Sequence, residues 1–216
     1  MAEVKICGIT DEEALEAAVN CGASYVGMVF FAKSPRFITP ERAAELLDGL
    51  PEDICRVGLF VDPSDRDLET ALSQVRLDLI QTHGVSSPER VDAIRQEFAM
   101  PVMPAFSVES AADIKAACRF EAVADRLLFD AKPPKGSDRP GGNAVSFDWS
   151  LLRDEKFSIP WMLAGGLTPE NVAEAIRISG AGAVDVSSGV ESAPGIKSPE
   201  KICAFIAAAG AKKRRA

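Results

Sequence analysis

The stretch Val4-Lys5-Ile6-Cys7-Gly8-Ile9-Thr10 runs from a short strand pattern directly into an amphipathic helix pattern. Far downstream, the strand pattern Leu127-Leu128-Phe129-Asp130 also ends in a side chain that can exchange a proton. In a parallel barrel the carboxyl ends of all the strands meet at one mouth. If both strands belong to such a barrel, the Cys7 thiol and the Asp130 carboxyl face each other across it.

Strand patterns alternate with helix-period segments along the whole chain. The strand patterns are short, rich in β-branched or aromatic residues and apolar on both faces, which is typical of a sheet buried on both sides. They cover residues 4–7, 25–30, 56–61, 79–82, 102–106, 126–130, 161–164 and 183–187.

The intervening segments carry helix signals. Thr39-Pro40-Glu41 and Thr168-Pro169-Glu170 each place a capping threonine before a proline at the first helical position. Ser110 followed by Asp113 predicts a capping box with the shorter acid. The apolar residues Ala14, Leu15, Ala18 and Val19 have the spacing of one buried helix face.

Eight strand–helix units with no linker between them predict a single (βα)8 barrel over residues 1–210. An open doubly wound sheet is the alternative, but Cys7-Gly8-Ile9-Thr10 lacks the glycine fingerprint of a dinucleotide-binding turn. Residues 211–216 form a basic tail, with Lys212-Lys213-Arg214-Arg215, that we expect to be frayed.

Composition excludes several classes of function. A net charge of −8 argues against a nucleic-acid partner. No apolar stretch approaches the ~18 residues of a membrane helix, and no signal segment precedes the first strand.

The cysteine pattern predicts reduced thiols. Five cysteines form no CxxC pair and there is one histidine, so we expect neither a disulfide framework nor a zinc site, and a cytoplasmic location. Apart from Cys7, each is expected to be a small core residue: Cys21, Cys55, Cys118 and Cys203.

The barrel rule selects the residues that carry chemistry, because side chains at the carboxyl ends of strands and in the following loops build the active site. These residues are Cys7, Arg36, His83, Asp130, Gly165, Gly166, Ser187, Ser188 and Gly189. The glycine- and serine-rich turns after the last two strands predict a phosphate site made of backbone N–H groups and hydroxyls. The connection over residues 131–147, rich in Lys, Pro, Gly and Ser, is predicted to be a lid.

Motifs across nearly the whole chain resemble those of the phosphoribosylanthranilate isomerase family. They are Lys5-Ile6-Cys7-Gly8-Ile9-Thr10, Lys33-Ser34-Pro35-Arg36-Phe37-Ile38, Val57-Gly58-Leu59-Phe60-Val61, Gln81-Thr82-His83-Gly84, Leu128-Phe129-Asp130, Gly141-Gly142 with Phe147-Asp148-Trp149, Ala164-Gly165-Gly166-Leu167, and Asp185-Val186-Ser187-Ser188-Gly189-Val190-Glu191 with Pro194-Gly195. Each alone is weak, but the ordered set is specific.

The resemblance implies a (βα)8 isomerase of tryptophan biosynthesis that needs neither cofactor nor metal. It implies an Amadori rearrangement of N-(5-phosphoribosyl)anthranilate with Cys7 as general base and Asp130 as general acid. Arg36 then pairs with the anthranilate carboxylate, and His83 lines the substrate site. Asp185 is expected to support the loop or point inward from its strand, without a catalytic role. Loose association with the next enzyme of the pathway is the one protein partnership that it suggests.

Two departures from the family pattern concern the lid and the aryl pocket. Asn143-Ala144 replaces the usual Ser or Thr followed by Gly, which restricts the backbone of the lid. Thr82 replaces a leucine before His83. The alternatives are the related aminoaldose isomerase of histidine biosynthesis, which has an aspartate where Cys7 stands, and a non-catalytic phosphate-binding barrel, which predicts loss of Cys7 or Asp130.

Overall fold

The computed structural model describes residues 2–132 and 146–211 of the 216-residue chain. The predicted lid, with Asn143-Ala144, and the predicted basic tail lie almost entirely outside these described residues.

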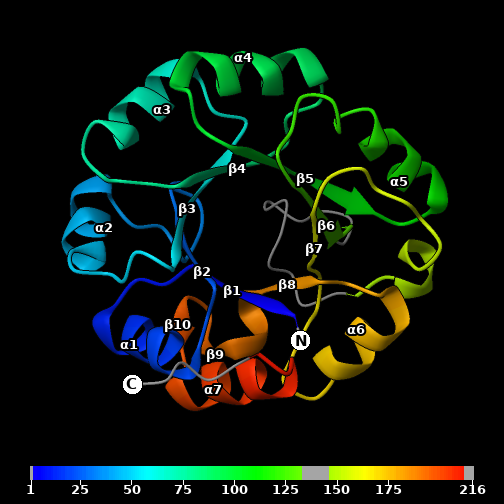
Figure 1. Ribbon diagram of the computed structural model, residues 1–216. Helices are drawn as coiled ribbons and strands as arrows, with labels where there is room; N and C mark the ends of the chain where they lie inside the picture. The colour runs from blue at the N-terminus through cyan, green and yellow to red at the C-terminus, as the bar shows by residue number, and fades with distance from the viewer. Residues whose placement is uncertain (1, 133–145, 212–216) are drawn as a thin grey trace.

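Eight parallel strands form a closed barrel in chain order, as predicted, with β1 paired to both β2 and β8. Figure 1 shows the ring of strands with the helices around it. The strands are β1 (Glu3–Cys7), β2 (Tyr25–Val29), β3 (Cys55–Val61), β4 (Leu79–His83), β5 (Val102–Val108), β6 (Leu127–Ala131), β7 (Trp161–Leu163) and β8 (Ala183–Val186).

The helices that follow the strands are α1 (Glu12–Cys21), α2 (Pro40–Leu47), α3 (Asp65–Leu72), α4 (Pro88–Phe98), α5 (Ala111–Cys118), α6 (Val172–Ser179) and α7 (Pro199–Ala208). The described residues between β6 and β7 form a 3-10 turn, η1 (Trp149–Leu152), where the pattern predicted an α-helix.

Local capping follows the predicted signals at two helices and departs from them at a third. Thr39 accepts a hydrogen bond from the Arg42 N–H at the start of α2, and Asp113 accepts from the Ser110 N–H at α5. The predicted start at Thr168 is wrong by a turn, because α6 begins at Val172. The side chain of Asn171 accepts from the Thr168 N–H and holds residues 168–171 as a separate turn.

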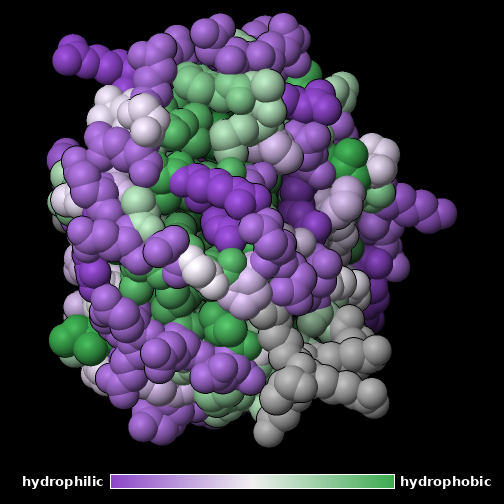
Figure 2. Space-filling model, turned by 60° about the vertical axis from the view of Figure 1, so that its left-hand side comes forward, coloured by the Kyte–Doolittle hydropathy of each residue, from purple (hydrophilic) through white to green (hydrophobic). Residues whose placement is uncertain are grey.

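Hydrophilic residues cover most of the face shown in Figure 2, and hydrophobic side chains show in a band between them. No helix in the described part of the chain is long and apolar enough to cross a membrane.

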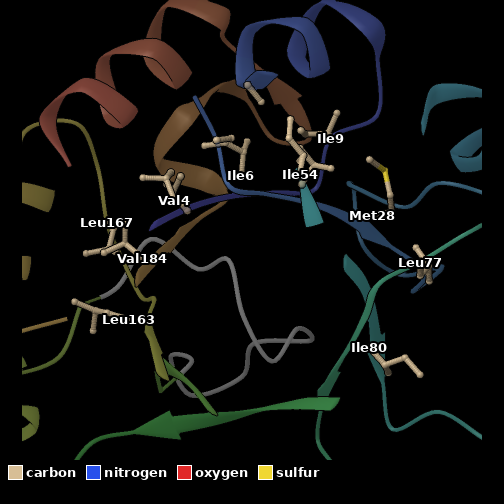
Figure 3. Packing of buried hydrophobic residues seen from close by; sticks show 14 of the residues in the cluster. Val4, Ile6, Ile9, Met28, Ile54, Leu77, Ile80, Leu163, Leu167 and Val184 are labelled. Atoms are coloured by element: carbon tan, nitrogen blue, oxygen red, sulfur yellow. The ribbon is translucent and has the colours of Figure 1, made fainter. Parts of the chain in front are cut away.

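Alternating side chains along the strands divide the buried apolar residues into two layers. Val4, Ile6 and Ile80 belong to the layer between strands and helices, part of which is seen in Figure 3. Met103 and Met162 belong to the layer inside the barrel. Lys5 and Cys7 lie on the inward face of β1, between the outward residues Val4 and Ile6, and therefore share the barrel interior.

A short hairpin that the sequence did not predict follows β8. The chain passes through a 3-10 turn, η2 (Ser188–Val190), and then forms the antiparallel pair β9 (Glu191–Ala193) and β10 (Ile196–Lys197) before α7. Gly195 brings this hairpin against the loop before α2, because a Cβ there would lie 2.4 Å from the Pro35 carbonyl oxygen.

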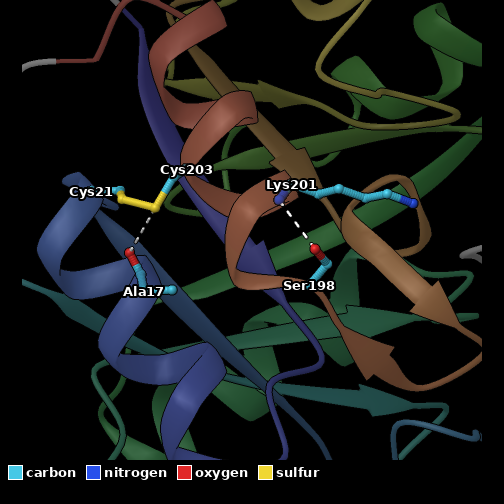
Figure 4. Close-up of a disulfide and its surroundings, with 5 residues drawn as sticks. All are labelled: Ala17, Cys21, Ser198, Lys201 and Cys203. Atoms are coloured by element: carbon cyan, nitrogen blue, oxygen red, sulfur yellow. Dashed lines mark hydrogen bonds between the residues drawn. A yellow bond between two sulfur atoms is a disulfide. The ribbon is translucent and has the colours of Figure 1, made fainter.

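The expectation that Cys21 and Cys203 are separate reduced thiols is wrong. A disulfide joins Cys21 at the end of α1 to Cys203 in α7, across 182 positions of sequence (Figure 4). The two helices pack side by side because the barrel closes between β1 and β8. Cys7, Cys55 and Cys118 are free, with Cys7 buried and the other two half-buried.

Candidate active site

Three residues selected from the sequence lie at the carboxyl ends of their strands. Cys7 ends β1, His83 ends β4 and Asp130 lies one residue before the end of β6. All three are buried. Asp130 lies on the same face of its strand as Leu128, and His83 on the same face as Leu79. Both leucines pack inside the barrel, so the two polar side chains also point inward.

An ion pair lies directly beneath the Cys7 thiol. Lys5 Nζ is 2.8 Å from Asp185 Oδ1, and the lysine side chain is fully buried. Lys5 and Asp185 are paired positions of the neighbouring strands β1 and β8. Asp185 therefore points inward from its strand, as expected.

Opposing influences act on the Cys7 thiol. Burial and the nearby charge of Asp185 raise its pKa, whereas the charge and hydrogen bond of Lys5 and the charge of Lys197 lower it. Burial prevails, so the pKa of the free thiol lies above its ordinary value.

Burial has a direct chemical consequence at Asp130. It raises the pKa of this carboxyl to about 7, and the charge of Asp185 acts in the same direction. The Ala131 N–H, which donates to Asp130 Oδ1 at 2.8 Å, and the charge of Lys5 only partly oppose this. A carboxyl with this pKa holds a proton in a large fraction of molecules at neutral pH.

His83 is a neutral imidazole in this setting. Burial and the charge of Lys5 lower its pKa to about 4. Its Nε2 lies 3.0 Å from Gln81 Nε2 on the same inward face of β4. This contact joins the imidazole to the Gln81 amide in the barrel interior.

A pocket lies at the ends of β6, β7 and β8. All the residues predicted for the phosphate site line it, together with both acids of the mouth: Asp130, Ala164, Gly165, Gly166, Leu167, Asp185, Val186, Ser187, Ser188 and Gly189. The two turns touch so closely that a Cβ at Gly189 would lie 1.8 Å from the Leu167 carbonyl oxygen. Glycine is therefore required there to keep the turns together.

The hydroxyl of Ser187 is already engaged. It donates to the Cys7 carbonyl oxygen at 3.0 Å and accepts from Lys197 Nζ at 3.2 Å. Ser187 thus ties the turn after β8 to the end of β1.

Arg36 is held by a partner that the sequence did not assign. Its Nε and Nη2 donate to the two carboxylate oxygens of Glu191 in β9, at 2.6 and 3.0 Å. Lys197 in β10 contacts the same carboxylate at 2.9 Å. Burial alone would raise the pKa of Glu191, but Arg36 and Lys197 hold it below its usual range.

Among the residues that the structure describes, no group bonds to the other edge of the guanidinium. Glu191 takes Nε and one N–H of Nη2, which leaves Nη1 and the second N–H of Nη2 for another planar acceptor. The aliphatic part of Arg36 lies against Gly8, next to Cys7.

Thr82 does not shape the barrel interior. Because Gln81 and His83 face inward, Thr82 between them faces the helices, and the expected effect on the aryl pocket is wrong. Among the described residues, its hydroxyl is one of the buried groups without a hydrogen bond.

Sequence reasoning missed Lys5, Gln81, Glu191 and Lys197. Strand alternation could have found the first two, because Lys5 shares a face with Cys7 and Gln81 shares one with His83. Within the described residues, no group of three or more His, Cys, Asp or Glu side chains is placed to hold a metal ion.

Residues 4–208 match the family model described as N-(5'-phosphoribosyl)anthranilate (PRA) isomerase. An N-(5'-phosphoribosyl)anthranilate isomerase of Paramagnetospirillum magneticum is 67% identical over 207 residues, covering 96% of each chain. The enzyme of the same name from Rhodospirillum rubrum is 57% identical over 209 residues, covering 95% of this chain and 96% of the relative.

Solved structures agree with this comparison. The phosphoribosyl anthranilate isomerase of Thermotoga maritima superposes with a TM-score of 0.86 at 37% identity, covering 97% of this chain and 99% of the other. A phosphoribosyl anthranilate isomerase in complex with reduced 1-(o-carboxyphenylamino)-1-deoxyribulose 5-phosphate gives 0.83 at 36% identity, with the same coverage.

Proposed function

Since the chain belongs to the family of N-(5'-phosphoribosyl)anthranilate isomerases, we propose that Cys7 and Asp130 carry out its two proton transfers. The supporting observation is that both side chains are buried at the carboxyl end of one barrel, beside a pocket formed by the turns after β7 and β8.

The chain is an isomerase of tryptophan biosynthesis that converts N-(5-phosphoribosyl)anthranilate to 1-(2-carboxyphenylamino)-1-deoxyribulose 5-phosphate. In this Amadori rearrangement an acid protonates the ring oxygen of the sugar, and the ring opens to an imine. A base removes the proton at C2 to give an enolamine, which tautomerises to the ketone. The atoms of the substrate are only rearranged, so no external oxidant or reductant takes part.

Asp130 is the acid of the first step. A pKa of about 7 leaves a protonated carboxyl available near neutral pH, with enough acidity to donate to the ring oxygen. After donation, the Ala131 N–H and the charge of Lys5 stabilise the carboxylate.

Cys7 is the base of the second step. The thiolate is the form that accepts a proton, and the cationic groups of Lys5 and Lys197 favour it against burial. The substrate lies between Cys7 and Asp130, so that different atoms of one sugar meet the base and the acid.

The phosphate group binds at the pocket formed by Gly165, Gly166, Ser188 and Gly189, through backbone N–H groups and the Ser188 hydroxyl. The Ser187 hydroxyl bonds to Cys7 and Lys197, so its contribution to the phosphate is its backbone.

Arg36 pairs with the anthranilate carboxylate through its open edge, since a planar guanidinium matches a carboxylate with two parallel hydrogen bonds. His83 lines the site as a neutral imidazole beside Gln81.

We also propose that residues 1–210 act as a single domain, and that the enzyme works in the cytoplasm on a small phosphorylated substrate. The closed barrel and the biosynthetic role support these two proposals. A reducing cytoplasm would keep the Cys21–Cys203 pair open. Loose association with the next pathway enzyme stays a prediction.

The experiment is to follow the loss of anthranilate-type fluorescence when the purified protein meets freshly made N-(5-phosphoribosyl)anthranilate. We expect rapid turnover by the parent chain and a loss of about 10²–10⁴-fold in kcat for Cys7→Ala and for Asp130→Asn. Cys55→Ala, which removes a free thiol outside the site, is the matched control and should retain full activity. Near-normal kcat in either site variant would remove that residue from the mechanism.

A further inference from the structure

A lysine in the barrel interior is adjacent to the proposed base. Lys5 is fully buried, and its side chain enters the interior from the same face of β1 as Cys7. Its ammonium bonds to Asp185 at 2.8 Å, from the neighbouring strand. The ion pair therefore fixes the position of the positive charge.

The neighbouring strand β2 leaves room for this lysine and the thiol together. Gly27 on β2 is the paired position of Cys7. A Cβ at Gly27 would lie 3.0 Å from Cys7 Sγ and 3.2 Å from Lys5 Nζ. Both atoms thus approach the same point on the backbone of β2, which a larger residue would partly occupy.

Stability alone does not explain a buried ion pair at this place. Removing two charges from water is costly, and an apolar pair of similar volume often serves a core equally well. Other inward positions of the barrel are filled by apolar side chains such as Met103 and Met162. A charge retained directly below a thiol calls for a chemical explanation.

We propose that Lys5 is a positioning residue of the active site: held by Asp185 and given room by Gly27, its ammonium lies against the Cys7 sulfur and favours the thiolate that removes the C2 proton. This inference rests on the proposed function of Cys7 as the base. It assigns opposite effects to the two partners, because Lys5 favours the thiolate and Asp185 opposes it.

Other charged groups around the thiol set the background of the test. Lys197 from β10 also favours the thiolate. Asp130 and His83 face the same interior, and the charge of Lys5 lowers the pKa of each. Conservative changes at Lys5 and Asp185 leave all three of these residues in place.

The test is a pH titration of the Cys7 thiolate by its ultraviolet absorbance, recorded on the full chain. Each spectrum is corrected with the same variant carrying Cys7→Ala, which subtracts the other thiols. We expect the thiol pKa to rise by about one unit or more in Lys5→Met and to fall in Asp185→Asn. The alkaline limb of the pH profile of kcat/KM should shift together with the thiol pKa.

Two further variants keep the test decisive if the charge left by Lys5→Met weakens folding. The double variant Lys5→Met/Asp185→Asn leaves no unpaired charge, and its thiol pKa should still exceed that of Asp185→Asn alone. Gly27→Ala retains both charges but crowds the point where they meet, and should also raise the thiol pKa.

Two results would overturn the assignment and leave the ion pair with a purely structural role. In the first, the double variant folds and its thiol has the same pKa as in Asp185→Asn. In the second, the thiol pKa shifts equally and in the same direction in both single variants. Failure of the proposed function has a different signature. If Cys7→Ala kept its turnover while the thiol pKa still shifted in Lys5→Met, Cys7 would lose its role as base but Lys5 would still act on the thiol.

Discussion

Burial shifts the pKa values of Asp130 and His83 in opposite directions, and both shifts favour the uncharged form of the side chain. It raises the pKa of the carboxyl to about 7 and lowers that of the imidazole to about 4. Both shifts follow from the cost of a charge in a poorly solvated interior. The mouth thus offers a carboxyl that can give up a proton and an uncharged ring that can orient a polar substrate.

The raised pKa of Asp130 implies a penalty in stability at alkaline pH. Its ordinary value is 3.8, so between pH about 4 and 7 the folded chain binds more protons than the unfolded chain, and the free energy of unfolding falls as pH rises. Asp130→Asn removes this loss. It should raise the free energy of unfolding at pH 8 by up to about 4 kcal/mol while lowering kcat by about 10²–10⁴-fold.

Denaturant titrations of the parent and of Asp130→Asn at pH 5 and pH 8 measure this difference. A smaller gain is expected at pH 5 than at pH 8, because the penalty grows over the whole range between the two pKa values and pH 5 lies near its lower end. An equal gain at both pH values would contradict the burial argument.

The hairpin of β9 and β10 has the clearest role among the elements. It carries Glu191 and Lys197 to the loop that bears Arg36, and so fixes a guanidinium that would otherwise have many rotamers. Pre-ordering of this kind reduces the entropy lost when a carboxylate binds.

Glu191→Gln should therefore weaken substrate binding more than chemistry. The amide can still accept one hydrogen bond from Arg36, but the charged two-point contact is lost. We expect KM to rise about 10-fold with kcat within a factor of two or three. Steady-state kinetics measure this split, and Arg36→Lys should give the same pattern. A fall in kcat with unchanged KM would instead link Glu191 to the proton transfers.

Elements differ in how far the sequence predicts them. Each barrel strand is apolar on both faces, so its pattern is visible without knowledge of its neighbours. The hairpin strands have three and two residues, too few for any period to show. Cys7, Asp130 and the late turns could be selected because they end strong strand patterns. Glu191 could not, because its partner Arg36 lies 155 positions away.

On the scale of the molecule, the barrel closes between its first and last units in two ways. Hydrogen bonds join β1 to β8 on the inside, and the Cys21–Cys203 disulfide joins α1 to α7 on the outside. No spacing rule pairs cysteines 182 positions apart, since only the closed ring of strands makes the two helices neighbours. Cys21 ends a helix that runs back from the mouth, so the bond lies toward the opposite end of the barrel from Cys7.

Opening this bond should lower stability without affecting turnover. Cys21→Ser/Cys203→Ser is expected to lose about 2–5 kcal/mol of unfolding free energy relative to the oxidised parent, because the unfolded chain gains the freedom of a long loop. Denaturant curves of the variant and of the parent with and without reductant measure the loss. The reduced parent should match the variant, and kcat should be equal in all three.

In the oxidised chain, the polypeptide from Cys21 to Cys203 forms a covalent ring with short free ends. A protease cut at any single peptide bond within that ring does not release a fragment. The nicked molecule keeps its mass on a non-reducing gel and separates into two pieces only when the sulfur bridge is reduced. Every proposed substrate-binding residue, and the proposed acid Asp130, thus lies on a segment that must be severed twice before any part of it can leave.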